Sequence, residues 1–596
     1  MLPTILCVLA VVRYTRAVES LVDLNYTRLQ GSAETVGITQ WLGVPYATAP
    51  LGGLRFAAPI DPPTTTGVVD ATQFRPICLP RSPTDFTMEP NERFRVDEDC
   101  LYVNIFAPSN ASDTSKLPVM YFVQGGGFES NSNANFNGSD LANFGNIVIA
   151  QINYRVGPFG FLQSQEVMNN GSLNVGLRDQ IQGLNWLQAN IAAFGGDPDH
   201  IVAAGDSAGA TSILLLMMAF AGNNPAPIKG AIMESASVAT LRTLDQGQEQ
   251  YNCLVNATGC DEMPDTLACL RAVPATSLQT EDCQFNPHLD NDIVPESMLA
   301  AFTAGRYLQI PTIAGTCTDE GTKNVPQDTN TTAQAVQFMQ DAASRTLSNN
   351  SLALLTQTYL TPDPPAPVFP SSGAAWRPLA NAMGDIRAHC VASHLQNGIA
   401  NASSNASTAA PPPTWNYRYA VLDPEDEAEG FGAYHTVELN GVFGPNNTDG
   451  APPRSYRASG VNAGIVPVTM GYWASFVRTL DPNALRAEGA PEWRPWTGIS
   501  GRERLRFQTN NTAMEAMERA QALNCEMVGP MIEVLERPPG LGSQALVELR
   551  RPSGTVLDGG SERSAAEVAL QSWGVTLRVG WATLAAGCMA TALVVL

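Results

Sequence analysis

The feature that most constrains the fold of this chain is the pentapeptide Gly205-Asp206-Ser207-Ala208-Gly209. It follows a short apolar run, residues 200–204, whose composition favours a β-strand. It precedes residues 210–219, whose small and unbranched side chains are typical of a buried helix. A G-x-S-x-G motif on a strand-to-helix turn is a nucleophile elbow, which lifts a serine hydroxyl clear of a sheet. This context predicts that Ser207 is a catalytic nucleophile.

A second glycine-rich segment supplies a candidate oxyanion hole. Residues 119–123 read as a buried strand that ends in Gln124-Gly125-Gly126-Gly127-Phe128. Successive glycines let backbone N–H groups turn toward a substrate without side-chain obstruction. The amides of Gly126, Gly127 and Ala208 are therefore the expected oxyanion donors. The alternative is an ordinary glycine-rich turn.

The chain has five histidines, so the catalytic base is sought by elimination. His200 lies at the start of the nucleophile strand, far from Ser207, while His389 and His394 fall in a helical pattern over 380–396. His288 stands in a polar loop without another catalytic feature. His435 follows a glycine-rich loop that leads into a helix, where an imidazole can reach over a sheet edge. We therefore predict that His435 is the base.

The acid is expected after another strand. Residues 312–315 read as a strand end, and Thr318-Asp319-Glu320-Gly321 follows closely. With Glu320 as the acid, the order Ser207, Glu320, His435 is the chain order of α/β-hydrolases.

Longer motifs extend this agreement. They are Glu98 to Asn104, Asn153 to Gly157, Asn174 to Gln180, Phe194 to Pro198 and Thr318 to Gly321. With these runs the chain resembles the type-B carboxylesterases, which include cholinesterases and fungal lipases, from about Val22 to about Leu535. The resemblance implies an α/β-hydrolase fold, in which helices flank a central, mostly parallel sheet and large loop and helical insertions are present. It also implies the catalytic set Ser207, Glu320 and His435 and the oxyanion hole Gly126, Gly127 and Ala208.

Two positions depart from the family pattern. Gln124 stands where the family often has histidine or an aromatic residue, and Asp206 replaces the usual glutamate before the nucleophile. Neither change removes a catalytic group. The oxyanion donors are backbone amides, so Gln124 affects local support alone.

The loop from Leu79 to Asp99 bears on the substrate. Cholinesterases, which the chain resembles, carry a tryptophan here for stacking on quaternary ammonium, whereas this loop has Phe86 and Phe94 and no tryptophan. In the fungal lipases the same loop is an amphipathic lid, but here it is short and polar, with Arg81, Asp85, Glu89, Glu92, Arg93 and Arg95. We therefore expect soluble or medium-chain esters as substrates.

The expected function is a serine carboxylic-ester hydrolase that forms an acyl-enzyme and needs no metal or cofactor. One alternative is a lipase or sterol esterase acting on long-chain esters, because a fold does not fix its substrate. A second is a non-catalytic, cholinesterase-like adhesion protein. The physiological ester and the oligomeric state do not follow from the sequence.

The chain is strongly acidic, with a formal net charge of −22. This charge argues against nucleic acid or anionic membrane surfaces as partners. It is most simply a solvated surface, and attraction of cationic substrates is the alternative.

Several features indicate the secretory pathway. Residues 1–17 combine a short apolar run with a small-residue cleavage site, as in a signal peptide. The glycosylation sequons are at Asn25, Asn110, Asn137, Asn170, Asn256, Asn330, Asn349, Asn401, Asn405, Asn446 and Asn510. Their number is typical of a glycoprotein.

Cysteine usage fits an oxidising compartment. The resemblance implies disulfides between Cys78 and Cys100, Cys260 and Cys269, and Cys390 and Cys525. The partners of Cys253, Cys283 and Cys317 stay open, because connectivity is not readable from sequence. Cys317 is expected to be a packing residue.

The catalytic domain is expected over 18–537, ending with a helix over 513–535 before Pro538-Pro539-Gly540. Residues 401–413 form an insertion rich in Ser, Ala and Pro, expected to be a glycosylated surface loop. A polar linker is expected over 538–565 and a hydrophobic tail over 566–596. The tail is interpreted as a GPI-attachment signal, with a transmembrane helix or a cleaved extension as alternatives. The predicted location is therefore secreted or on the outer face of the plasma membrane, with any membrane contact made through this tail alone.

Overall fold

The computed structural model describes residues 20–34, 36–82, 92–224, 227–361, 365–401, 411–448, 452–498, 501–540 and 546–552. The predicted signal peptide, the tail over 566–596 and the sequon at Asn405 lie outside these ranges.

Within these ranges, eleven strands form one sheet in the order β16-β15-β14-β13-β12-β11-β9-β10-β8-β4-β3. Neighbours from β10 to β15 pair in parallel, and the pairs at both edges are antiparallel. The strands are β3 (Ser32–Ala33), β4 (Ile38–Pro45), β8 (Tyr102–Pro108), β9 (Leu117–Val123), β10 (Val148–Ile152), β11 (Gly196–Asp206), β12 (Ile228–Glu234), β13 (Thr312–Cys317), β14 (Thr414–Tyr419), β15 (Glu503–Phe507) and β16 (Ala513–Ala516). The predicted α/β-hydrolase architecture is confirmed.

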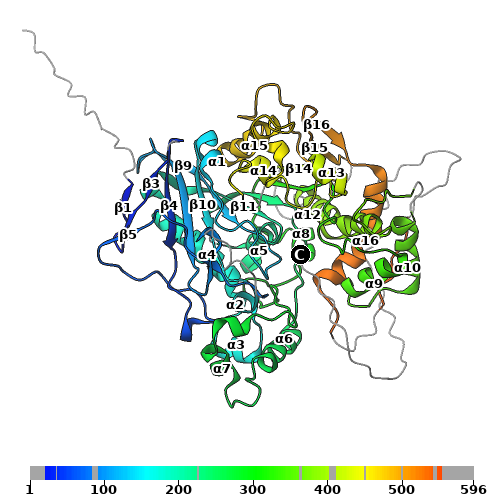
Figure 1. Ribbon diagram of the computed structural model, residues 1–596, viewed down its shortest axis with the longest axis horizontal. Helices are drawn as coiled ribbons and strands as arrows, with labels where there is room; N and C mark the ends of the chain where they lie inside the picture. Colours follow the sequence, from blue (N-terminus) through cyan, green and yellow to red (C-terminus); the bar gives the residue numbers. More distant parts are fainter. Residues whose placement is uncertain are drawn as a thin grey trace, which may run out of the picture.

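Two small sheets accompany the large one. β1 (Leu21–Asp23), β2 (Arg28–Gln30) and β5 (Val68–Asp70) form the first, and β6 (Ile77–Cys78) pairs with β7 (Val96–Asp97) in the second. Figure 1 places β1, β3 and β5 at one end of the molecule and α9, α10 and α16 at the opposite end.

The α-helices are α1 (Ser139–Gly145), α2 (Gly157–Phe161), α3 (Gln165–Asn170), α4 (Val175–Asn190), α5 (Ala208–Gly222), α6 (Leu244–Ala257), α7 (Thr266–Ala272), α8 (Met298–Thr303), α9 (Thr332–Ala342), α10 (Asn349–Leu355), α11 (Trp376–Gly384), α12 (Cys390–Asn401), α13 (Pro424–Glu429), α14 (Leu439–Val442), α15 (Ile465–Thr479) and α16 (Arg519–Glu536). Between α11 and α12 the chain forms a π-helical turn, η7 (Asp385–His389). Across the described ranges, no helix is both long and apolar enough to cross a membrane.

Alternate residues of the central strands enter two hydrophobic cores, as the two-residue period of a strand requires. On β9, Tyr121 and Val123 face the core that contains α4 and α5, whereas Met120 and Phe122 face the core that contains α1 and α15. The sheet is therefore covered on both faces, which explains why β10 and the second halves of β9 and β11 are buried at every residue.

The strand order reverses at β9, because β10 lies on one side of β9 and β11 on the other. In open α/β sheets, ligands bind outside the carboxyl ends of the strands at such a switch point. The loop after β9 begins at Gln124, and the turn after β11 holds Ser207. The topology therefore brings the two predicted catalytic segments to one place.

One secondary-structure prediction was wrong. The helix expected over 513–535 begins at Arg519, because Ala513–Ala516 instead pairs with β15 and Glu515 forms ion pairs with Arg418 and Arg504. There tertiary contacts outweigh the local helical pattern. The helical pattern expected over 380–396 is confirmed, and the helix there runs through α11, η7 and α12 with a π-helical turn at its centre.

Part of the predicted linker lies against the folded domain. Val547 forms a parallel bridge with Leu347, and its carbonyl oxygen accepts a hydrogen bond from Ser351 Oγ at 2.7 Å. Leu549 is buried, and its N–H donates to the same Ser351 oxygen. The residues around 547–549 are thus held against α10 and the segment before it.

Candidate active site

Ser207 occupies a sharp turn between β11 and α5. Its backbone has φ 52° and ψ −123°, a conformation rare outside glycine and often found at functional sites. Its amide N–H donates to the Glu234 carbonyl oxygen at 2.8 Å. A Cβ at Gly205 or Gly209 would lie 2.6 Å or 2.0 Å from the Val123 carbonyl oxygen. Side chains at either flanking position would collide with β9, so the turn requires glycine on both sides.

The predicted base and acid lie beside this serine. The distance between His435 Nε2 and Ser207 Oγ is 2.9 Å, and that between His435 Nδ1 and Glu320 Oε2 is 2.5 Å. Both distances are in hydrogen-bonding range. Ser207 and Glu320 are buried. The structure therefore brings together the three side chains that the sequence singled out, from three loops more than 100 residues apart.

The acid and base loops are tied to each other by the residue that precedes Glu320. The Asp319 N–H donates to the Ala433 carbonyl oxygen, and Asp319 Oδ2 accepts from the Ala433 N–H, both at 2.8 Å. Arg377 forms an ion pair with the other oxygen of Asp319. Asp319 thus fixes the loop that presents His435.

Electrostatics favour a charged acid and a basic imidazole. Burial alone would lower the pKa of His435, but the charge and hydrogen bond of Glu320 outweigh it, so the pKa is raised. Burial would raise the pKa of Glu320, but the charge and hydrogen bond of His435 outweigh that effect, so the pKa is lowered. Glu320 is therefore suited to stabilising an imidazolium.

A buried polar cluster lies behind the acid. Glu320 Oε1 accepts hydrogen bonds from Ser235 Oγ and the Cys317 N–H, both at 2.7 Å. Glu438 is bonded to Ser235 at 3.2 Å, Tyr417 at 2.9 Å and the Cys317 thiol at 2.8 Å. Burial and the charge of Glu320 raise the pKa of Glu438. The Ser235 hydroxyl thus lies between the Glu320 and Glu438 carboxyl groups and can donate to either of them.

The sequence interpretation missed this cluster, and Cys317 does more than the packing expected of it. Its N–H contacts the acid while its thiol contacts Glu438. One signal was available: Glu438 stands three residues after His435, on the segment that leads into α14. No motif marks Ser235.

The glycine loop after β9 is held by Asp206, the residue before Ser207. The Gly125 N–H donates to Asp206 Oδ1 at 3.0 Å. Gly126 and Gly127 have φ of 112° and 64°, values that favour glycine. The Gly126 carbonyl oxygen accepts from the Ser130 N–H at 2.9 Å, which closes the loop into a tight turn. Asp206 therefore supports the loop, a role that the sequence did not indicate.

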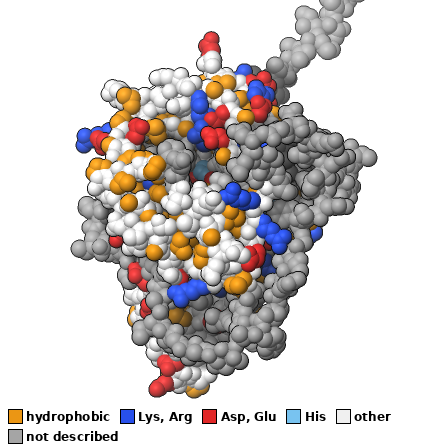
Figure 2. All heavy atoms as spheres, turned by 90° about the vertical axis from the view of Figure 1, so that its right-hand side faces the viewer, with side chains coloured by type: hydrophobic (Ala, Val, Ile, Leu, Met, Phe, Trp, Pro, Cys, Tyr) orange, Lys and Arg blue, Asp and Glu red, His pale blue; other side chains and the backbone are white. Residues whose placement is uncertain are grey.

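A cavity of about 640 Å³ opens at this site. Figure 2 shows a hollow on this side of the molecule, with a histidine visible in it and acidic and basic side chains around it. Ser207, Glu320, His435, Gly127 and Ala208 line the cavity. Gly126 precedes them in the loop and is not among the lining residues.

The other four histidines bond elsewhere. His200 Nε2 lies 2.8 Å from the Val477 carbonyl oxygen, and His288 Nδ1 lies 3.2 Å from that of Asn286. Burial lowers the pKa of His288 to about 4. His389 and His394 contact threonine hydroxyls at 2.7 Å and 3.3 Å. Within the part of the chain that the structure describes, no three potential ligands are grouped to hold a metal ion.

The loop from 79 to 99 is described at its two ends. Asp85, Phe86 and Glu89 lie outside the described residues. Arg81 is buried and pairs with Glu129 at 2.9 Å. The Arg93 guanidinium lies 5.1 Å from the Phe94 ring centre and donates to the Asn135 carbonyl oxygen at 2.6 Å. The charges at these two positions are thus directed inward.

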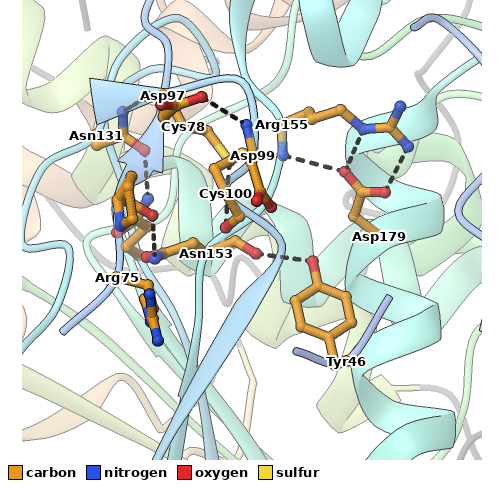
Figure 3. Close-up of a disulfide and its surroundings, with 12 residues drawn as sticks. Tyr46, Arg75, Cys78, Asp97, Asp99, Cys100, Asn131, Asn153, Arg155 and Asp179 are labelled. Carbon is orange, nitrogen blue, oxygen red and sulfur yellow. Dashed lines mark hydrogen bonds and ion pairs between the residues drawn. A yellow bond between two sulfur atoms is a disulfide. The ribbon is translucent and has the colours of Figure 1, made fainter. Parts of the chain in front are cut away.

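Figure 3 shows that several motif residues form a buried network beside the Cys78–Cys100 disulfide. Arg155 donates two side-chain hydrogen bonds to Asp179, at 2.8 Å and 2.7 Å. Tyr46 donates to the Asn153 carbonyl oxygen at 2.7 Å. These motifs therefore hold the scaffold together and do not contact the reacting groups.

Four disulfides link the described cysteines. Three are the pairs that the resemblance implies: Cys78–Cys100, Cys260–Cys269 and Cys390–Cys525. The fourth joins Cys253 to Cys283, for which no pairing was predicted. Among the described residues, Cys317 is free and buried.

The sequons lie at the surface. Asn137 is half-buried, and the other described sequon asparagines are exposed: Asn25, Asn110, Asn170, Asn256, Asn330, Asn349, Asn401, Asn446 and Asn510.

Comparisons with known proteins find similar sequences and structures. A model of the carboxylesterase family matches residues 18–526. Secreted lipase 1 of Botryotinia fuckeliana is 30% identical over 78% of this chain and 85% of its own length. Para-nitrobenzyl esterase of Bacillus subtilis is 33% identical over 72% of this chain and 83% of its own. The crystal structure of Aspergillus niger EstA has a TM-score of 0.79 and 36% identity, covering 87% of this chain and 99% of that one.

Proposed function

Because the chain belongs to the carboxylesterase family and is a serine carboxylic-ester hydrolase, we propose that Ser207 is its nucleophile, His435 its general base and Glu320 its acid. The observation that carries the proposal is the 2.9 Å contact between His435 Nε2 and Ser207 Oγ, with Glu320 on the other ring nitrogen. A histidine held in this way can take the serine proton only through its free Nε2 lone pair.

The reaction then has two halves. His435 takes the Ser207 proton as the hydroxyl oxygen attacks the ester carbonyl, and it returns that proton to the leaving alkoxide. Water, activated by His435, hydrolyses the acyl-enzyme and releases the acid. Glu320 stays ionised and stabilises the imidazolium in both halves.

The oxyanion of each tetrahedral intermediate is assigned to the amides of Gly126, Gly127 and Ala208. The positive φ values of both glycines and the place of Ala208 at the first turn of α5 support this assignment. Each donor in such a site contributes roughly 3–4 kcal/mol to transition-state stabilisation.

Short- to medium-chain esters are the proposed substrates. The polar side chains that line the cavity support this choice, among them Gln246, Gln284, Asn286 and Asn324. Hydrolysis of p-nitrophenyl esters from acetate to palmitate, by the protein and its Ser207→Ala variant, tests it. An optimum below about eight carbons is expected, whereas an optimum at palmitate would favour a lipase. Equal, negligible rates for both proteins would contradict ester hydrolysis through Ser207 and favour the alternative of a non-catalytic adhesion protein.

We further propose cleavage of a signal peptide over 1–17, a catalytic domain over 18–537, glycosylation at the exposed sequons and GPI attachment through the segment after the linker over 538–565. The disulfides and the similarity to a secreted lipase support an extracellular protein. Treatment of expressing cells with phosphoinositide-specific phospholipase C should release the activity. Retention after verified digestion would contradict the GPI anchor.

A further inference from the structure

One arginine in the cavity wall, Arg387, has no opposing charge among the described residues. Arg387 lies on η7 and lines the cavity together with Ser207 and His435. Among the described residues, no hydrogen bond or ion pair reaches its guanidinium, and burial is the sole influence on its pKa. Burial lowers this pKa to about 10, so the side chain is still a cation at neutral pH.

The other charged residues of the cavity wall are opposed by neighbours. Arg345 pairs with Asp341 at 2.8 Å, and Glu129 pairs with Arg81 at 2.9 Å. Arg242 donates to Gln284 at 3.0 Å. Burial lowers the pKa of Arg242, and the negative charges of Glu129 and Glu249 oppose that shift. Apart from the catalytic residues, Arg387 is thus the one described charge of this wall without an opposing group.

The Arg387 side chain is half-buried. An unpaired guanidinium is costly to withdraw even partly from water, and charges withdrawn from water in proteins are normally paired. Its planar fork of five N–H donors matches a carboxylate, which it can bind through two parallel hydrogen bonds. A cation left without a partner in a substrate cavity is therefore a binding group whose partner arrives with the ligand.

We propose that Arg387 binds a free carboxylate on the substrate, so the enzyme prefers esters whose acid or alcohol half is anionic, such as half-esters of dicarboxylic acids. This inference rests on the proposed function, because it needs Ser207 to attack an ester held in the same cavity. It runs against the cationic substrates that the net charge of −22 suggested as an alternative. The overall charge slows the approach of an anion, whereas Arg387 acts on the bound substrate.

The test compares matched ester pairs in the full-length protein. Monoethyl adipate and ethyl heptanoate differ by a carboxylate on the acid side, and 4-acetoxybenzoate and p-tolyl acetate differ by one on the alcohol side. For each pair, kcat/KM is measured for the wild type, Arg387→Met and Arg345→Met. Arg345 is the matched control, because it lines the same cavity but is exposed and paired with Asp341.

We expect Arg387→Met to lower the anionic-to-neutral ratio of kcat/KM about 10- to 100-fold for one pair, the loss typical of a charge-assisted hydrogen bond. Arg345→Met should change that ratio less than about twofold, in line with an exposed ion pair. The affected pair shows whether the acid or the alcohol half carries the carboxylate. Arg387→Lys, which keeps the charge but loses the fork, should give an intermediate ratio, and Arg387→Gln replaces the Met variant if that protein does not fold.

Unchanged ratios in Arg387→Met for both pairs, with the neutral esters still hydrolysed, would overturn the anion site and leave the proposed function standing. Hydrolysis of neither member by the wild type above the rate of Ser207→Ala would overturn the proposed function and the anion site together.

Discussion

Replacing Glu320 with glutamine should move the ring proton of neutral His435 from Nδ1 to Nε2. Glu320 Oε1 accepts from the Ser235 hydroxyl and the Cys317 N–H, so the glutamine carbonyl oxygen is held at that position. The glutamine NH₂ then faces His435 Nδ1, 2.5 Å from the acid in the wild type, and donates to it. The ring proton must move to Nε2, where it points at Ser207 Oγ and removes the lone pair that accepts the serine proton.

The expected cost is a loss in kcat of roughly 10³- to 10⁴-fold, as found when the acid of a serine triad becomes an amide. This loss equals about 4–5.5 kcal/mol of transition-state stabilisation. Neighbouring carboxylates do not replace the lost one. Asp319 is held by Arg377 and the Ala433 N–H, and Glu438 is bonded to Tyr417 and Cys317.

The assay is the hydrolysis of p-nitrophenyl butyrate at saturating substrate, and the rate of the Ser207→Ala variant is subtracted as background. Glu320→Asp is the control, because it keeps the charge and shifts the carboxylate by one methylene, with an expected loss of about 10²-fold. Proton NMR should show the Nδ1–H of His435 in the wild type and its absence in Glu320→Gln. A Glu320→Gln variant that keeps more than a tenth of wild-type kcat would refute the tautomer argument.

Four other outcomes are expected. kcat/KM should rise with pH through an apparent pKa above the ordinary 6.5 of histidine, because Glu320 raises the pKa of His435 and the base must be neutral; a midpoint below 6.5 would contradict this. Asp206→Ala should lower kcat/KM about 10- to 100-fold by leaving the Gly125 N–H without its acceptor, and Asp206→Asn should lower it less, since its oxygen can still accept; equal losses would argue against the loop role. Replacing Cys253 and Cys283 with serine should lower the free energy of unfolding by up to about 3.6 kcal/mol, the chain-entropy value for a 30-residue loop, as measured by urea denaturation; no change in midpoint would contradict it. Burial raises the pKa of Glu536 to about 7 from an ordinary value of 4.5, so the stability that its protonated carboxyl contributes is fully present below pH 4.5 and is lost as the pH rises through 7. Glu536→Gln should therefore raise the free energy of unfolding by about 3 kcal/mol relative to the wild type at pH 8, and leave it unchanged at pH 4. Thermal unfolding at the two pH values checks this through Tm, which should rise at pH 8 alone.

The site was predictable where the chemistry depends on local backbone geometry. Gly205 and Gly209 indicate the nucleophile elbow, because a Cβ at either position would collide with β9. This constraint can be read from five consecutive residues. His435 could be found by elimination among five histidines. The elements next to the site followed too, since residues 119–123 of β9 and 201–204 of β11 are apolar runs and α5 starts at the motif itself.

What the sequence did not reveal depends on contacts between distant segments. Ser235 and Glu438 meet Glu320 from β12 and the His435 loop, and no motif joins them. Ala513–Ala516 has a helical composition but pairs with β15, where Glu515 forms ion pairs with three arginines. Arg387 lies in a stretch that reads as an ordinary helix, and its significance comes from a cavity built by other segments.

The most direct test of the account is covalent labelling of the nucleophile. Diethyl p-nitrophenyl phosphate transfers its phosphoryl group to an activated serine and releases p-nitrophenol, and peptide mass spectrometry locates the adduct. We expect one diethylphosphoryl group, on Ser207, with loss of esterase activity in step with labelling and no reaction of Ser207→Ala. An adduct on another residue, or activity that survives complete labelling of Ser207, would contradict the triad.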